Sequence, residues 1–132
     1  MKTYFVDTSG WYDLLFSGAT SHEAIKQQLG DPSVRLVTST YVLDELVSLV
    51  LSRRDHRTAA QVGSHIRASA EVHVEHPDAT EERHAWTLFL DRPDKRYTLT
   101  DCLSFVMMRR LGLTTALATD DHFRQEGFET VP

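Results

Sequence analysis

Short β-forming segments alternate with helical segments along the chain, and this alternation constrains the fold more than any other feature. The first β-forming run, residues 3–6, stops at a polar group suited to a helix start. The other predicted strands are residues 34–38, 72–75, 115–118 and 128–131. Because right-handed crossovers place a helix between successive parallel strands, the alternation predicts an α/β fold with a mainly parallel sheet covered on both faces.

The intervening helices are predicted from apolar spacing and from polar pairs typical of helix starts. Three such pairs are Thr20 with Glu23, Asp78 with Glu81, and Thr98 with Asp101. Gly112 is expected to end the last long helix, and the polar stretch 91–96 is the clearest predicted loop. The side chains expected on buried helix faces are Trp11, Leu14, Leu15, Leu43, Leu46, Val47, Val50, Ala59, Val62, Ile66, Ala70, Trp86, Phe89, Leu103, Val106, Met107, Met108 and Leu111.

The length and the cysteine content limit the class of protein. A chain of 132 residues is expected to form one domain, residues 1–132, around a single core. Cys102 is the only cysteine, which excludes an internal disulfide and a cysteine-rich zinc site and fits a reducing compartment. No apolar stretch approaches the roughly 18 residues of a membrane span, so we expect a soluble, cytoplasmic protein without membrane contact.

The net charge of −5 argues against a protein that coats nucleic acid by electrostatics alone. It does not exclude RNA as a substrate, because four carboxylates around divalent cations would form a nearly neutral site. Basic residues that could steer a phosphate chain, or simply solvate helix ends, form three clusters: Arg53, Arg54 and Arg57; Arg92, Lys95 and Arg96; Arg109 and Arg110.

Four acidic residues stand where a parallel sheet would bring them together. Asp7 directly follows the first predicted strand and Asp120 the fourth, so both are expected at the carboxyl edge of the sheet. Asp101 opens the helix that leads into the fourth strand, and Glu45 lies near the start of the helix that leaves the second. In open α/β sheets ligands bind beyond the carboxyl ends of the strands, so this edge is the predicted site.

Such a cluster suits hard divalent cations, which prefer oxygen ligands. A metal-activated water could then attack a phosphodiester, and no protein nucleophile would be required. This agrees with a chain that has neither a G-x-S-x-G motif nor a P-loop. Each acid also has a structural explanation: Asp7, Asp101, and either Asp120 or Asp121 could cap helices, and Glu45 could be a solvated surface residue.

Four short motifs occur in order at these strand ends and helix starts. They are Val6-Asp7-Thr8-Ser9, Asp44-Glu45-Leu46, Leu99-Thr100-Asp101-Cys102-Leu103-Ser104 and Ala116-Leu117-Ala118-Thr119-Asp120-Asp121-His122-Phe123. Their order and spacing over essentially the whole chain resemble the PIN-domain family, and within it the VapC-like toxins of type II toxin–antitoxin systems. The resemblance implies a three-layer α/β/α fold of strand order 3-2-1-4-5.

The resemblance also implies a metal-dependent RNA endonuclease that uses Mg²⁺ or Mn²⁺. Carried over by position, the catalytic and metal-binding residues would be Asp7, Glu45, Asp101 and Asp120. Thr8 and Ser9 would supply hydroxyls that hold a ligand or a water, and Asp121 is a further candidate for positioning water. The implied partners are an RNA substrate and a small antitoxin bound beside the site, and the toxin is expected to form a homodimer.

Four rival interpretations compete with this one. A PIN-like RNA-processing nuclease without an antitoxin, or a catalytically inactive PIN-like binding module, would share the same motifs, although the presence of all four acids speaks against inactivity. A phosphoacceptor receiver domain needs a lysine late in the chain, whereas the last one is Lys95. A zinc site is disfavoured because the seven histidines form no His-x-x-x-His or His-Glu-x-x-His motif.

Overall fold

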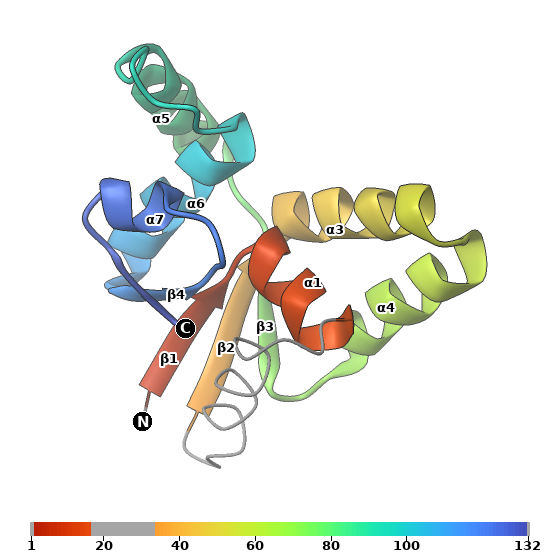
Figure 1. The fold of residues 1–132 in the computed structure, drawn as a ribbon. Helices are drawn as coiled ribbons and strands as arrows, with labels where there is room; N and C mark the ends of the chain where they lie inside the picture. Colours follow the sequence, from red (N-terminus) through yellow and green to blue (C-terminus); the bar gives the residue numbers. More distant parts are fainter. Residues whose placement is uncertain (1, 17–33, 132) are drawn as a thin grey trace.

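A parallel five-stranded sheet organises the part of the chain that the computed structural model describes, residues 2–16 and 34–131 (Figure 1). The strands are β1 (Lys2–Val6), β2 (Val34–Ser39), β3 (Val72–Glu75), β4 (Thr115–Leu117) and β5 (Glu129–Val131). Their order is β3-β2-β1-β4-β5 and every neighbouring pair is parallel, so the predicted strand order is confirmed.

Helices cover both faces of this sheet, which confirms the predicted three-layer α/β/α fold. They are α1 (Thr8–Phe16), α3 (Thr40–Arg53), α4 (His56–Ala68), α5 (Ala79–Leu90), α6 (Leu99–Leu111) and the short α7 (His122–Gln125). Helices α1, α3 and α4 form one group, and α5, α6 and α7 lie on the other side of the strands (Figure 1). The helix expected to begin at the Thr20 and Glu23 pair falls outside the described residues.

Local hydrogen bonds set the helix ends, as the polar pairs predict. The Asp78 carboxylate accepts from the backbone N–H of Glu81 at 2.8 Å, and Glu81 in turn accepts from the N–H of Asp78 at 3.4 Å. The pair of Thr98 and Asp101 makes the same reciprocal bonds at 3.0 and 2.9 Å. Gly112 ends α6 with a φ of 70°, a left-handed conformation that glycine adopts without steric cost. Both capping predictions that lie within the described residues are therefore confirmed.

The core lies on both sides of the sheet and contains most of the predicted apolar side chains. Met107 and Met108 of α6 are fully buried, as are Phe5 of β1 and Phe123 of α7. Phe105 packs edge-on against Phe123, with ring centroids 4.9 Å apart. The interpretation of the methionine pair as core is thereby confirmed.

Three expectations about burial are wrong. Trp86 and Phe89 share a face of α5, but that face is outward: they are 52% and 39% exposed and stack on each other with ring centroids 5.6 Å apart. The small side chain of Ala85 is buried instead. Leu15 is 38% exposed, and Ala70 lies beyond the end of α4 and is exposed. Spacing predicts which residues share a face, but the packing of neighbouring elements decides which face is covered.

A close contact between α1 and β4 positions the residues of the candidate active site. A Cβ added to Gly10 would overlap the backbone carbonyl of Leu117, so glycine allows the helix to approach the strand end. On the other side, the indole N–H of Trp11 donates to Thr38 Oγ1 at 3.2 Å, and the Thr38 hydroxyl donates to the carbonyl of Val6 at 2.9 Å. These contacts fix the start of α1 over the carboxyl ends of β1, β2 and β4.

Glu126, just after α7, ties the C-terminal segment to the predicted loop before α6. Its carboxylate is 5% exposed. It accepts two hydrogen bonds from Arg92 at 3.1 Å, one from Arg109 at 3.0 Å and one from the Tyr97 hydroxyl at 3.1 Å.

Among the described helices, none is both long and apolar enough to cross a membrane.

Candidate active site

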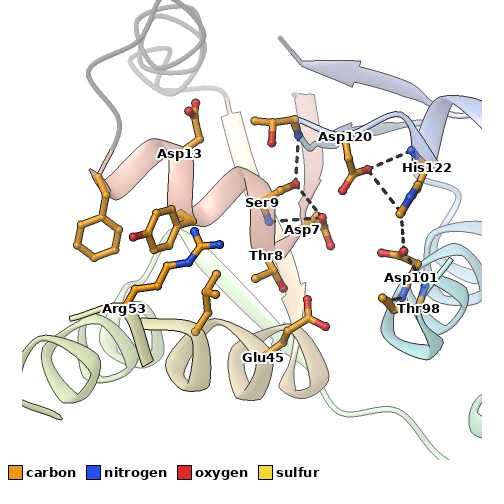
Figure 2. A pocket seen from close by; sticks show the side chains of 14 residues that line it. Asp7, Thr8, Ser9, Asp13, Glu45, Arg53, Thr98, Asp101, Asp120 and His122 are labelled. Atoms are coloured by element: carbon orange, nitrogen blue, oxygen red, sulfur yellow. Dashed lines mark hydrogen bonds and ion pairs between the residues drawn. The ribbon is translucent and has the colours of Figure 1, made fainter. Parts of the chain in front are cut away.

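A pocket of about 490 Å³ opens at the carboxyl edge of the sheet, beside the ends of β1 and β4 and the early turns of α1 and α3. All four predicted acids line it, together with the two predicted hydroxyl residues (Figure 2). The lining residues are Asp7, Thr8, Ser9, Tyr12, Asp13, Phe16, Glu45, Leu49, Arg53, Thr98, Asp101, Thr119, Asp120 and His122. Side chains that are far apart in sequence thus converge where the parallel topology predicts.

Asp7 lies at the centre of the site and is 3% exposed. Its Oδ2 accepts hydrogen bonds from the Ser9 hydroxyl at 2.9 Å and from the Ser9 backbone N–H at 3.4 Å. Its Oδ1 is buried and finds no hydrogen-bond partner among the described residues. Burial, reinforced by the charges of Asp101 and Asp120, raises the pKa of Asp7 to about 7, although the hydrogen bond from Ser9 opposes that shift.

The side-chain hydroxyls of Ser9 and Thr8 differ in their hydrogen bonding. The Ser9 Oγ, which donates to Asp7, also accepts from the backbone N–H of Thr119 at 3.1 Å, so it links the segments that follow β1 and β4. The Thr8 Oγ1 is buried and, like the Asp7 Oδ1, has no partner within the described part of the chain. Ser9 therefore orients a carboxylate, whereas Thr8 offers an unused donor and acceptor near the same pocket.

Asp101 serves both as a helix cap and as a pocket residue. Its Oδ2 accepts from the backbone N–H of Thr98 at 2.9 Å and is hydrogen-bonded to His122 Nδ1 at 2.8 Å. The residue is 5% exposed, and burial raises its pKa even though these hydrogen bonds favour the ionised form. The capping and the functional interpretations of Asp101 are therefore compatible.

Asp120 and His122 meet at the end of β4. The Asp120 Oδ1 accepts from the backbone N–H of His122 at 3.0 Å and lies 3.9 Å from the His122 ring nitrogen Nδ1. The His122 ring also contacts Tyr97 edge-on, with centroids 5.6 Å apart. His122 thus connects two of the four acids (Figure 2). His122 is not among the site residues named from the sequence, although a histidine two residues after a strand-end aspartate is an available signal.

Glu45 extends from the second turn of α3 toward the space between Asp7 and Asp101 (Figure 2). It is partly exposed and lines the same pocket. Asp121 does not line the pocket: its side chain is 67% exposed and ion-paired with Arg124. The structure therefore gives no support to the water-positioning role expected for Asp121, because the backbone turn that directs Asp120 inward directs its neighbour outward.

The four carboxylates line one pocket but do not close on a single point. Within residues 2–16 and 34–131, no group of three or more histidine, cysteine, aspartate or glutamate side chains is arranged to hold a metal ion. Asp101 and Asp120 instead turn oxygens toward nearby N–H donors. The roles of the four acids as catalytic residues and metal ligands accordingly stay predictions.

Comparisons with known proteins agree with this architecture. The model of the PIN-domain family matches residues 4–129. The chain is 36% identical over 127 residues to a protein from Mycobacterium tuberculosis named 23S rRNA-specific endonuclease VapC20, and the match covers 96% of each chain.

Solved structures show the same similarity. The crystal structure of Mycobacterium tuberculosis VapC20, described as a sarcin-ricin loop cleaving toxin, matches with a TM-score of 0.87 and 35% identity over 98% of this chain and 99% of that one. VapBC-1 from nontypeable Haemophilus influenzae shares the fold, with a TM-score of 0.71 and 16% identity over 97% and 96%. The family model and the identity to VapC20 together show that this chain belongs to the PIN-domain family.

Proposed function

We propose that this protein is a metal-dependent endoribonuclease that hydrolyses RNA phosphodiester bonds at the pocket lined by Asp7, Glu45, Asp101 and Asp120. The observation that carries the proposal is the buried Oδ1 of Asp7, an atom without a partner among the described residues on a side chain that lines a pocket with three further carboxylates. A buried, uncompensated carboxylate is unfavourable unless a cation or a proton neutralises it.

The residues present fit Mg²⁺ or Mn²⁺. Both ions favour oxygen ligands, and all four acids offer carboxylate oxygens without nearby thiolates, since the buried Cys102 does not line the pocket. Asp7, Glu45, Asp101 and Asp120 would hold the ion. When bound, such a cation supplies positive charge beside the phosphate and an acidified water.

The protein's own groups prepare the carboxylates for this role. Ser9 holds one oxygen of Asp7, and the other oxygen stays without a partner among the described residues. Thr98 and His122 fix the orientation of Asp101, and the His122 backbone N–H fixes Asp120. The adjacent buried Thr8 hydroxyl has a free donor and acceptor among the described residues, so it can hold a water or a phosphate oxygen.

The proposal is tested by incubating the purified protein with ribosomal RNA and mapping the new ends. We expect Mg²⁺- or Mn²⁺-dependent cuts that leave 5′-phosphate and 3′-hydroxyl ends, are abolished by EDTA and are restored by added metal. Asp7→Asn should abolish cleavage while the variant keeps the wild-type circular dichroism spectrum.

A matched control is Asp94→Asn, which makes the same chemical change at a side chain that is 71% exposed and lies outside the pocket. We expect this variant to retain wild-type cleavage. If the Asp7→Asn protein, in a preparation free of contaminating nuclease, retains Mg²⁺-dependent cleavage, the proposed site is wrong.

The substrate and the partner are proposed from the relatives. The name of the 36% identical VapC20 specifies 23S rRNA, so we propose ribosomal RNA as the substrate and the cytoplasm as the place of action. The solved neighbours include VapBC complexes, which supports a small antitoxin as the partner that inhibits this chain. The homodimer stays a prediction, which sedimentation of the purified protein would test.

A growth assay tests the toxin role separately from the chemistry. Induction of the wild-type chain should arrest bacterial growth, induction of Asp7→Asn should not, and co-expression of an antitoxin encoded beside the toxin should restore growth. Cleavage in vitro without growth arrest would favour an RNA-processing nuclease over a toxin.

A further inference from the structure

The pocket extends from the four acids along α1 to a cluster of rings and guanidinium groups. We call this cluster the arginine arm and define it as Tyr12 and Phe16 of α1 with Arg53 and Arg54 at the end of α3. Tyr12, Phe16 and Arg53 line the same pocket as the acids. Its volume of about 490 Å³ lies within the range of pockets that take whole small molecules, roughly 300–1,000 Å³. There is therefore room for more than the phosphate that reacts.

The arm is organised by contacts between its cations and rings. The Arg53 guanidinium carbon lies 5.1 Å from the centre of the Tyr12 ring, and that of Arg54 lies 4.0 Å from the centre of the Phe16 ring. The two rings contact each other, with centroids 4.8 Å apart. Both arginines are exposed and both rings are partly exposed. The arm thus presents two positive charges and the accessible parts of two aromatic rings beside the acids.

The charges of the arm are not neutralised by ion pairs, unlike those of Arg92, Arg109 and Arg110 in the other clusters. Arg92 and Arg109 bind the carboxylate of Glu126, and Arg110 is ion-paired with two glutamates. Arg53 and Arg54 have no carboxylate within ion-pair distance in the described part of the chain. Asp13 also lines the pocket, but it projects from the opposite side of α1 (Figure 2).

We propose that the arginine arm binds the single-stranded RNA that adjoins the cleaved bond: Arg53 and Arg54 contact its phosphates and Tyr12 and Phe16 stack on its bases. This inference rests on the proposed nuclease function. Guanidinium groups match phosphate oxygens, and unpaired RNA bases stack on aromatic rings. An RNA strand that places one phosphate at the four acids must continue beyond the edge of the pocket. The arm offers positive charge there, although the chain as a whole has a net charge of −5.

The first test measures binding of a 5′-labelled single-stranded RNA oligonucleotide by fluorescence anisotropy in EDTA, where no cleavage occurs. Arg53→Glu should weaken binding about tenfold or more. The control Arg67→Glu changes the net charge by the same amount. Arg67 is exposed and lies in the last turn of α4, just before β3 begins. This control should change the affinity less than about twofold. The logarithm of the binding constant falls linearly with the logarithm of the salt concentration, and each phosphate contact to a single strand contributes about 0.7 to the slope. Removing Arg53 and Arg54 together should therefore reduce that slope by about 1.4.

The second test separates the rings from the charges. Tyr12→Phe keeps the ring and should bind RNA like the wild type, whereas Tyr12→Leu should bind about fivefold or more weakly. Melting curves followed by circular dichroism verify that each variant is folded. Equal binding by Tyr12→Phe and Tyr12→Leu would show that the ring does not contact RNA.

A small substrate distinguishes failure of the arm from failure of the nuclease proposal. The wild type should hydrolyse bis(p-nitrophenyl) phosphate with Mn²⁺, because this ester reaches the acids without occupying the arm. If the wild type hydrolyses neither ester nor RNA, the nuclease function itself is wrong. If the nuclease is active and Arg53→Glu binds RNA as well as Arg67→Glu does, the arm is wrong. Loss of antitoxin binding by Arg53→Glu with RNA binding unchanged would assign the surface to a protein partner instead.

Discussion

Replacing Asp7 by asparagine should change how the stability of the metal-free protein depends on pH. Asp7 is 3% exposed, and its Oδ1 has no partner among the described residues. In the native state the carboxyl group holds its proton up to a pKa of about 7, whereas in the unfolded chain it ionises near its ordinary value of 3.8. The native state therefore binds more protons across this interval, and its stability falls as the pH rises through it.

The size of the effect follows from the same two values. One pKa unit corresponds to about 1.36 kcal/mol. A rise of the pKa from 3.8 to about 7 therefore lowers the free energy of unfolding by roughly 4 kcal/mol, and the full loss is reached above pH 7. Asparagine cannot ionise, but its amide places an N–H where the Asp7 Oδ1 has no partner, at a cost of about 1–3 kcal/mol. Near pH 5 the wild type has lost only about 1.6 kcal/mol of this stability, so the variant and the wild type should differ there by about 1 kcal/mol or less, whereas near pH 8 the variant should be roughly 1–3 kcal/mol more stable.

The assay is urea unfolding in EDTA at about pH 5 and pH 8, followed by tryptophan fluorescence, which changes as the buried Trp11 becomes exposed. A residual pH dependence is expected in the variant, because burial also raises the pKa of Asp101. Adding Mn²⁺ at pH 8 should stabilise the wild type and leave Asp7→Asn largely unchanged, since a ligand that binds only the native state stabilises it.

Asp94→Asn is the control, because its carboxylate is exposed and should leave the pH profile of the wild type intact. The reasoning would be refuted if the wild type were equally stable at both pH values in EDTA, or if Asp7→Asn followed a parallel profile. Either result would mean that the Asp7 carboxylate is already neutralised within the folded chain.

Three further outcomes are expected. Gly10→Ala should destabilise the protein by about 2 kcal/mol or more in urea unfolding, because the added Cβ overlaps the carbonyl of Leu117; unchanged stability would contradict the close packing of α1 on β4. Glu126→Gln should lower the free energy of unfolding by about 2 kcal/mol at neutral pH. Hydrogen bonds outweigh burial and lower the Glu126 pKa, so the stabilisation by the Glu126 carboxylate should be present above about pH 4.5 and disappear on acidification. A constant difference in stability between variant and wild type from pH 7 to pH 3 would oppose this. Cys102, whose pKa burial raises to about 11, should react with thiol reagents only at the rate of unfolding, and rapid labelling of native protein would contradict its burial.

Much of the candidate site follows from local sequence signals. Asp7 and Asp120 each follow a strand, and the parallel topology brings strand ends to one edge whatever the loops between them do. His122 was missed because its contact with Asp101 joins residues 21 positions apart, and nothing in the local pattern indicates that distance. The outward face of Trp86 was missed for a related reason, since the position of α6 decides which side of α5 is covered.

Alternation of β-forming and helical segments, capping pairs and strand-end acids are properties of a few consecutive residues, and they sufficed to predict the layers, the helix starts and the edge at which the acids gather. Orientation across the pocket was settled only when separate elements packed together. The unpartnered oxygen of Asp7, the contact of His122 with Asp101 and the juxtaposition of Arg53 with Tyr12 all depend on distances between elements. Such distances arise from close packing of side chains, which no periodic pattern encodes.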